Sequence, residues 1–337
     1  MRALRASDQP SRRARAPSMS SHSFPVRRAV VLAPGRSGST LLQSVFLANC
    51  DALTFFEPCR HSPDGDVRKD KCVAQVLRYL SCDLPQANGD WDPPAIRGWL
   101  RHPYHDANTS CVQPPLRSVA KTRLACQRVQ LLLVKEIRLV GELARLAAAL
   151  TFTQPNTGST AIIHLVRDPR PMLASQKRLR WWGFGEMTSR RRRLEMERVA
   201  KRTCEGMVAD AAVGDALQRA GKIRYFLVRF EELTADLEST TLRLYAQLGL
   251  PLPHTTVEWM NRTLGGHCAH GSAEDASANA SIADKQFEYS TCRQKRARRS
   301  REARSSARWK HLLTMHEKRA INTHCAGAFA RFGYSQS

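Results

Sequence analysis

A run of glycine, hydroxyl and guanidinium groups lies between two apolar stretches near the start of the chain. Its members are consecutive: Gly35, Arg36, Ser37, Gly38, Ser39 and Thr40. A turn of this composition between a strand and a helix directs backbone N–H groups at one point, where the helix dipole adds partial positive charge. The glycines allow close approach of a ligand, and the hydroxyls and the guanidinium add hydrogen-bond donors. The segment therefore predicts a cradle for phosphate or sulfate.

The same segment has two other interpretations. A nucleotide-binding P-loop has the pattern GxxxxGK[ST], but here no lysine follows the second glycine and the spacing is too short. A serine- and glycine-rich turn without a ligand also remains open on this segment alone. A second motif further along the chain decides between these interpretations.

The second motif begins where the apolar run 161–166 ends. Arg167, Asp168 and Pro169 follow the run, and Ser175 lies eight residues after Arg167, on the helix predicted next. Because a residue before proline avoids helical geometry, the Asp-Pro step favours a turn that faces a ligand. Two strand-to-helix corners in this order are much more specific than either one alone.

With both motifs present, the chain resembles the sulfotransferases that use 3′-phosphoadenylyl sulfate (PAPS), and among them the Golgi carbohydrate sulfotransferases. The resemblance also includes LLLVKEIRL at 131–139, RYFLVRFEEL at 224–233 and LYAQLGLP at 244–251. It covers most of residues 28–334, through the closing ARWK…FGY, and is weakest over 59–130 and 265–300. It implies transfer of a sulfuryl group from PAPS to a hydroxyl, with release of 3′,5′-ADP.

The resemblance assigns the two corners to opposite ends of the donor. In the family the first loop binds the 5′-phosphosulfate, which implies that role here for Gly35 and residues 36–40. The later arginine and serine bind the 3′-phosphate, which here implies Arg167 and Ser175. A surface ion pair and a helix hydroxyl are the structural alternatives for these last two residues.

Sulfuryl transfer moves charge onto the oxygen that leaves with the nucleotide, and fixed cations aimed at that oxygen should lower the barrier. Arg36 is one predicted catalytic cation. Lys135, just after the apolar run 131–134, is the second, since related sulfotransferases place a lysine similarly. An exposed lysine at a strand end is the alternative for Lys135.

The acceptor hydroxyl needs a base within reach. Glu57 closes the segment TFFEP, and the family has a similar Phe-Glu-Pro element. A glutamate in this place is thought to be the base in related tyrosine-directed enzymes. Its apolar neighbours predict desolvation, so we expect the pKa of Glu57 to be raised. The alternative is a loop carboxylate that caps a backbone group or pairs with Arg60.

The acceptor that the resemblance implies is a glycan or a glycoprotein, with a sugar 6-hydroxyl as the target. Tyrosine or another non-glycan hydroxyl is the alternative. Residues 59–130 are predicted to be an irregular excursion, with one or two helices, that shapes the acceptor site.

Apolar runs that alternate with amphipathic stretches predict the fold. We expect strands at 29–32, 131–134, 161–166 and 223–230, a further apolar run at 52–56, and helices at 39–49, 141–150, 189–220, 237–248, 310–330 and from 170 onward. This alternation predicts a three-layer α/β domain with a mainly parallel central sheet. His164, mid-strand, is expected to be a core histidine, and Trp181 and Trp182 are expected to pack rather than stack on the donor.

The composition limits the classes of function. The 337 residues include 53 Lys and Arg against 30 Asp and Glu, a net charge of +23, which favours anionic partners such as an anionic acceptor. A kinase or nucleotidase is disfavoured, because the sequence has no Gly-Lys-Ser/Thr element and no evident acidic magnesium-binding segment. A basic nucleic-acid-binding protein is the other alternative, but no such motif occurs and aromatic residues make up only 7%. The basic run 190–193 is predicted to be a solvated helix face.

Ten cysteines and three glycosylation acceptor sequences favour an oxidising lumen, in the Golgi or elsewhere in the secretory pathway. Cys111 with Cys126 and Cys268 with Cys292 are candidate disulfides, although the sequence leaves the connectivity open. Because no Cys-x-x-Cys pair or zinc-like spacing occurs, no metal site is expected. The acceptor asparagines are Asn108, Asn261 and Asn279.

Residues 28–334 are expected to form one sulfotransferase domain after a disordered basic segment, residues 1–27. That segment has no apolar core, and no run of 18 apolar residues occurs, so no membrane span is expected in this chain. Residues 265–308 are predicted to be a basic loop region. Its seven Lys and Arg residues between 293 and 304 lie where the family has a cofactor-contacting loop.

Overall fold

The structure, a computed structural model, describes residues 28–61, 69–84, 119–153, 160–181, 188–264 and 309–335. The expected basic segments 1–27 and 265–308 lie outside these residues, so both remain predictions. Within the described residues, every helix is too short or too polar to cross a bilayer.

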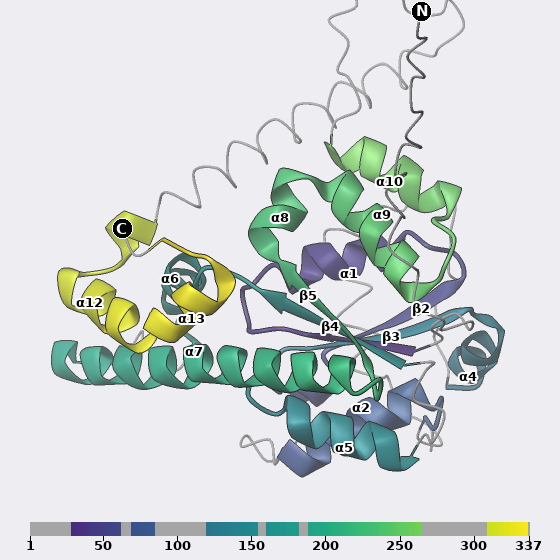
Figure 1. The fold of residues 1–337 in the computed structure, drawn as a ribbon, viewed down its shortest axis with the longest axis horizontal. Coiled ribbons are helices and arrows are strands. Elements are labelled where there is room, and N and C mark those ends of the chain that lie inside the picture. Colours follow the sequence, from purple (N-terminus) through teal and green to yellow (C-terminus); the bar gives the residue numbers. More distant parts are fainter. Residues whose placement is uncertain are drawn as a thin grey trace, which may run out of the picture.

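Five parallel strands form the central sheet of the described chain, in the order β2-β3-β1-β4-β5 (Figure 1). Their bounds are Arg28–Leu32 (β1), Ala52–Phe56 (β2), Leu131–Glu136 (β3), Thr160–Val166 (β4) and Arg224–Arg229 (β5). Nearly all of their residues are buried, as in a parallel sheet covered on both faces. The expected parallel sheet is confirmed, and the run 52–56 is one of its edge strands.

Alternate strand residues face two separate cores, which makes the domain three layers thick. Val30 and Leu32 pack on the side of α2 (Lys69–Leu80) and α5 (Leu143–Thr153), whereas Ala29 and Val31 pack on the side of α1 (Ser39–Leu47) and α9 (Leu237–Leu248). Figure 1 shows α1, α8 (Phe230–Ala235), α9 and α10 (His254–Leu264) together on one face of the sheet. The predicted three-layer α/β class is confirmed.

A third core forms around the long helix α7 (Ser189–Arg219). It packs against α6 (Pro169–Arg178), α12 (Met315–His324) and α13 (Ala326–Phe332). The predicted continuous helix 310–330 is wrong, because Thr314 caps the start of α12 in a capping box and α12 ends at His324, with Cys325 as its C-cap. A disulfide between Cys204 and Cys325 fixes this break against α7.

Two helices, α2 and α4 (Val119–Arg128), lie in the described part of residues 59–130, and a short helix, η1 (Pro58–His61), precedes them. Cys82, just beyond α2, is bonded to Cys126 of α4, with 5.9 Å between their Cα atoms. The expected pair Cys111–Cys126 is therefore wrong, because Cys126 is bonded to Cys82. The pair Cys268–Cys292 lies outside the described residues.

Candidate functional site

The residues singled out in the sequence follow or end neighbouring parallel strands, so they meet at one edge of the sheet. The loop 33–38 follows β1, Glu57 follows β2, Lys135 is near the end of β3, and Arg167 follows β4. The chain leaves β1 toward β2 and leaves β4 toward β5 (Figure 1). The crevice between β1 and β4 is therefore the switch point of the topology, where ligands bind in open α/β sheets.

The loop after β1 turns tightly into α1. Gly38 is the N-cap, with a φ of 91°, and no side chain caps this helix. The N–H groups of Leu41 and Leu42 donate to the Gly38 carbonyl, which leaves those of Ser39 and Thr40 without a backbone acceptor among the described residues. The hydroxyl of Ser37 is fully buried and has no hydrogen-bond partner among the described residues. These are donors arranged for an anion.

The loop after β1 and the corner after β4 are bonded directly to each other. Arg36 Nε donates to Ser175 Oγ over 3.1 Å, and Arg167 Nη1 donates to the carbonyl of Arg36 over 3.1 Å. Gln176 Nε2 donates to the carbonyl of Gly35 over 2.7 Å. The structure therefore brings Arg36, Arg167 and Ser175 together, as both ends of one compact donor site would require.

Phe230, at the start of α8, supports both corners, and the sequence analysis did not single it out. Its ring lies 4.1 Å from Arg167 Cζ, and a Cβ on Gly38 would come within 2.2 Å of the same ring. Arg167 Nε is buried and has no hydrogen-bond partner among the described residues. Burial lowers the pKa of Arg167, although a guanidinium remains charged at all ordinary pH values. The sequence offered one sign of this role, because Phe230 lies in the segment 224–233, which is part of the family resemblance.

A buried ion pair occupies the ends of β2 and β3. Lys135 Nζ lies 2.6 Å from Glu57 Oε1, and the exposed fractions of the two side chains are only 2% and 8%. Lys135 Nζ also lies 3.7 Å from the centre of the Phe56 ring. The alternative of an exposed strand-end lysine is therefore wrong. Lys135 is next to Glu136 on β3, and the Glu136 carbonyl accepts the N–H of Ala33 over 3.2 Å. The strand that carries Lys135 is therefore hydrogen-bonded to the start of the loop after β1.

The expected rise in the pKa of Glu57 is wrong. Burial alone would raise it, but the charges and hydrogen bonds of Lys135 and Arg138 outweigh burial and hold the pKa below its ordinary value. Glu57 is thus a carboxylate fixed by two cations, at 2.6 Å and 3.0 Å. For Lys135, burial lowers the pKa, although Glu57 opposes the shift.

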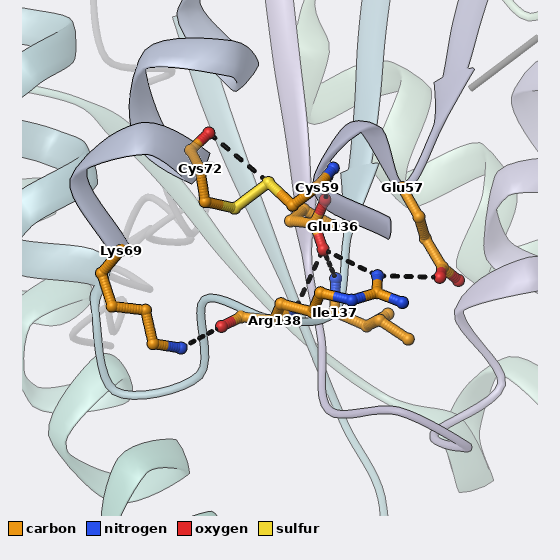
Figure 2. The surroundings of a disulfide bond; sticks show 7 residues. All are labelled: Glu57, Cys59, Lys69, Cys72, Glu136, Ile137 and Arg138. Carbon is orange, nitrogen blue, oxygen red and sulfur yellow. Dashed lines mark hydrogen bonds and ion pairs between the residues drawn. A yellow bond between two sulfur atoms is a disulfide. The ribbon is translucent and has the colours of Figure 1, made fainter. Parts of the chain in front are cut away.

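Arg138 and Glu136 complete this cluster, and neither was predicted as a site residue (Figure 2). The fully buried Glu136 carboxylate accepts the N–H groups of Cys59, Ile137 and Arg138 at 3.0, 2.9 and 3.0 Å. Burial raises its pKa, although Arg138 opposes that shift. The sequence offered one sign that they belong to the site: both lie close to Lys135 in the segment 131–139, which is part of the family resemblance.

The histidine and the two tryptophans considered in the sequence were expected to pack in the protein and not to contact the ligand. His164 is buried, and its Nδ1 lies 2.8 Å from the Tyr225 hydroxyl. Its burial confirms the expected core histidine, and the same burial lowers its pKa to about 3. Trp181 packs on Gly35, where a Cβ would come within 2.3 Å of the indole. Trp182 lies outside the described residues.

Comparison with known proteins finds a family match and relatives of similar sequence. A model of the sulfotransferase family matches residues 29–254. Carbohydrate sulfotransferase 1 of Rattus norvegicus is 25% identical over 300 residues, which cover 74% of this chain and 72% of the relative. Carbohydrate sulfotransferase 5 of Homo sapiens is 24% identical, with 90% and 77% covered. The sulfotransferase domain of the Synechococcus PCC 7002 olefin synthase aligns with a TM-score of 0.40 and 16% identity, covering 71% of this chain and 78% of that one.

Proposed function

The chain belongs to the sulfotransferase family, and from this premise we propose that it transfers a sulfuryl group from PAPS to a hydroxyl of a carbohydrate acceptor. The relatives named carbohydrate sulfotransferases support the acceptor class. The acceptor is a glycan or glycoprotein, and a sugar 6-hydroxyl is the target. The excess of Lys and Arg in the sequence favours an anionic acceptor.

The observation that carries the proposal is the direct contact between the two predicted donor-binding corners, at Arg36, Arg167 and Ser175. PAPS carries a 5′-phosphosulfate and a 3′-phosphate on one ribose. Two protein corners that bind one anion each must therefore lie close together. The partnerless Ser37 hydroxyl and Arg167 Nε are buried donors that such anions would satisfy. We assign the phosphosulfate to Gly35 and residues 36–40, and the 3′-phosphate to Arg167 and Ser175.

The proposed reaction forms one S–O bond and breaks another. The acceptor oxygen attacks sulfur, the bond from sulfur to the phosphate oxygen breaks, and 3′,5′-ADP leaves. Arg36 and Lys135 stabilise the charge that develops on the sulfuryl group and on the leaving oxygen. Glu57 takes the proton of the acceptor hydroxyl, which becomes acidic only as the new bond forms.

The proposed setting is an oxidising compartment of the secretory pathway, such as the Golgi lumen. Three disulfides within the described residues support it, at Cys59–Cys72, Cys82–Cys126 and Cys204–Cys325. Asn261, one of the three acceptor asparagines, is exposed on α10. We further propose that residues 28–334 act as one catalytic domain, with 59–130 next to the acceptor.

Thermal unfolding with added ligands tests the donor assignment. We expect 3′,5′-ADP to raise the Tm strongly, whereas ATP with magnesium and duplex DNA should leave it nearly unchanged. Labelled PAPS offered with a panel of glycans, and with a tyrosine peptide, then identifies the acceptor. Stabilisation by DNA without stabilisation by 3′,5′-ADP would refute the proposal.

A further inference from the structure

Glu57 is held by two cations that approach different oxygens of its carboxylate. Lys135 Nζ contacts Oε1 at 2.6 Å, and Arg138 Nη1 contacts Oε2 at 3.0 Å. Family resemblance implied separate roles for Lys135 and Glu57, whereas nothing in the sequence assigned a role to Arg138. The two contacts therefore raise the question of why one buried carboxylate needs two cations.

Arg138 is anchored by Glu136 and by Lys69 of α2. The Glu136 carboxylate accepts both its backbone N–H, at 3.0 Å, and its Nη1, at 3.3 Å. Lys69 of α2 donates to its carbonyl. Figure 2 shows its guanidinium extending from Glu136 toward Glu57. Arg138 is thus fixed without any contribution from the donor-binding loop.

The segment that carries Glu57 is fixed by the same buried acid. Glu136 Oε2 accepts the Cys59 N–H at 3.0 Å, and Cys59 is bonded to Cys72 of α2. The Glu57 N–H itself donates to the Lys135 carbonyl over 2.8 Å. The backbone of this segment and the guanidinium of Arg138 therefore share one support, Glu136.

Lys135 has a different task in the proposed reaction, because its ammonium must face the sulfuryl group. In the present structure its Nζ is held 2.6 Å from Glu57 Oε1, so a turn toward the sulfuryl group would weaken this ion pair. Removing the only partner of a buried carboxylate would leave an uncompensated charge, which is strongly unfavourable. A second, independently anchored cation removes this obstacle.

We propose that Arg138 is a positioning residue for sulfuryl transfer, which keeps the Glu57 carboxylate in place and compensated when Lys135 turns to the donor. This inference rests on the proposed function. Its consequence is that donor binding leaves Glu57 with one cation in place of two. The pKa of Glu57 then rises from its lowered value, so the carboxylate becomes a stronger base only once the donor is bound.

The test compares Arg138→Gln and Arg138→Lys with wild type and with Arg145→Gln. Arg145 is a suitable control because it is an exposed arginine that pairs with Asp70 and Glu142 and does not contact Glu57. We expect Arg138→Gln to lower kcat by on the order of 10- to 100-fold, with 3′,5′-ADP affinity unchanged within about twofold. Arg138→Lys should recover part of kcat, and Arg145→Gln should match wild type.

A pH profile separates positioning from a merely structural role. In the free enzyme two cations hold the pKa of Glu57 below its ordinary value, so the acid limb of kcat/KM for PAPS should lie at low pH in wild type, and Arg138→Gln removes one of the two cations. The limb should therefore move to higher pH in Arg138→Gln and return toward wild type in Arg138→Lys. Unchanged kcat and an unchanged limb in Arg138→Gln would overturn the inference. So would equal loss of activity and 3′,5′-ADP binding in both Arg138 variants. A wild-type protein that binds no 3′,5′-ADP would instead refute the proposed function itself, and the inference with it.

Discussion

Arg36 Nε lies 3.1 Å from Ser175 Oγ, although 139 residues separate the two along the chain. The contact joins the loop after β1 to the helix after β4, across the switch point of the sheet. We propose that the arginine and the serine hydroxyl that meet there bind the same anionic nucleotide. Damage to either corner of this proposed donor site should then weaken binding of the whole nucleotide.

The first prediction concerns Arg167. Replacement by alanine removes the contact with the Arg36 carbonyl, the stacking on Phe230 and the charge proposed to face the 3′-phosphate. We expect Arg167→Ala to weaken 3′,5′-ADP binding by about 1.5–3 kcal/mol, the range for a charge-assisted hydrogen bond. Isothermal titration calorimetry measures it directly. Arg243→Ala, an exposed arginine paired with Glu232, is the control, and equal affinity in both variants would argue against the assignment.

The second prediction concerns Gly38, where an added side chain would lower stability in two ways, through backbone strain and through a clash with Phe230. Gly38 has a φ of 91°, and an added Cβ would lie 2.2 Å from the Phe230 ring. Gly333 has a φ of 68° with nothing within 4 Å of an added Cβ. Both alanine variants should lose about 1–2 kcal/mol of unfolding free energy to backbone strain. Gly38→Ala should lose about 1–3 kcal/mol more through the clash.

Chemical denaturation of the two glycine variants measures this difference. Gly38→Ala should also lose affinity for 3′,5′-ADP, since the clash displaces either the loop or Phe230. Equal stability and full affinity in both variants would mean that Phe230 moves aside without consequence. In that event Phe230 would not support the donor site.

The third prediction concerns Glu57. Glutamine keeps the shape of the side chain but cannot accept a full proton, so Glu57→Gln should lower kcat by about 10²- to 10⁴-fold. Binding of 3′,5′-ADP should persist, because no donor-site residue is changed. Rate assays with labelled PAPS beside calorimetry provide both quantities. Near-normal turnover would remove Glu57 from the role of base.

The parts of the fold that could be predicted are those with continuous apolar runs. The runs 29–32 and 161–166 became β1 and β4 within one residue, because a parallel strand buried on both faces must be apolar throughout. The helix 237–248 was predicted with its end at Gly249, whose φ of 70° favours glycine. Local chemistry determines these features, so a single sequence is sufficient.

The Glu57 cluster could not be predicted in this way, because it depends on contacts between distant segments. Lys135 and Glu57 are 78 residues apart, and they meet because Phe56 pairs with Lys135 in the β2–β3 register. The sequence suggested desolvation of Glu57 but contained no sign that Lys135 and Arg138 would outweigh it. For the same reason the pairing of Cys82 with Cys126 was missed, since the two cysteines are 44 residues apart and come from different segments.

The last prediction concerns Asp210, a buried carboxylate on α7. Its two oxygens accept the N–H groups of Gly141 and Leu143 at 2.7 and 2.8 Å, just where α5 begins. Burial raises its pKa from 3.8 to about 6, although both N–H groups oppose the shift. Between these two values the folded protein binds more protons than the unfolded chain, so its stability falls as the pH rises.

Asparagine at position 210 cannot ionise, so Asp210→Asn should remove this pH dependence while losing one backbone hydrogen bond. At pH 4 the variant should therefore be less stable than wild type. As the pH rises to 7, ionisation of Asp210 costs the wild type up to about 3 kcal/mol, so the gap should narrow. Tm measurements at intervals from pH 4 to 7 follow this change. A constant difference over that range would mean that Asp210 ionises equally easily in the folded and unfolded chains, and that its burial between α7 and α5 has no electrostatic cost.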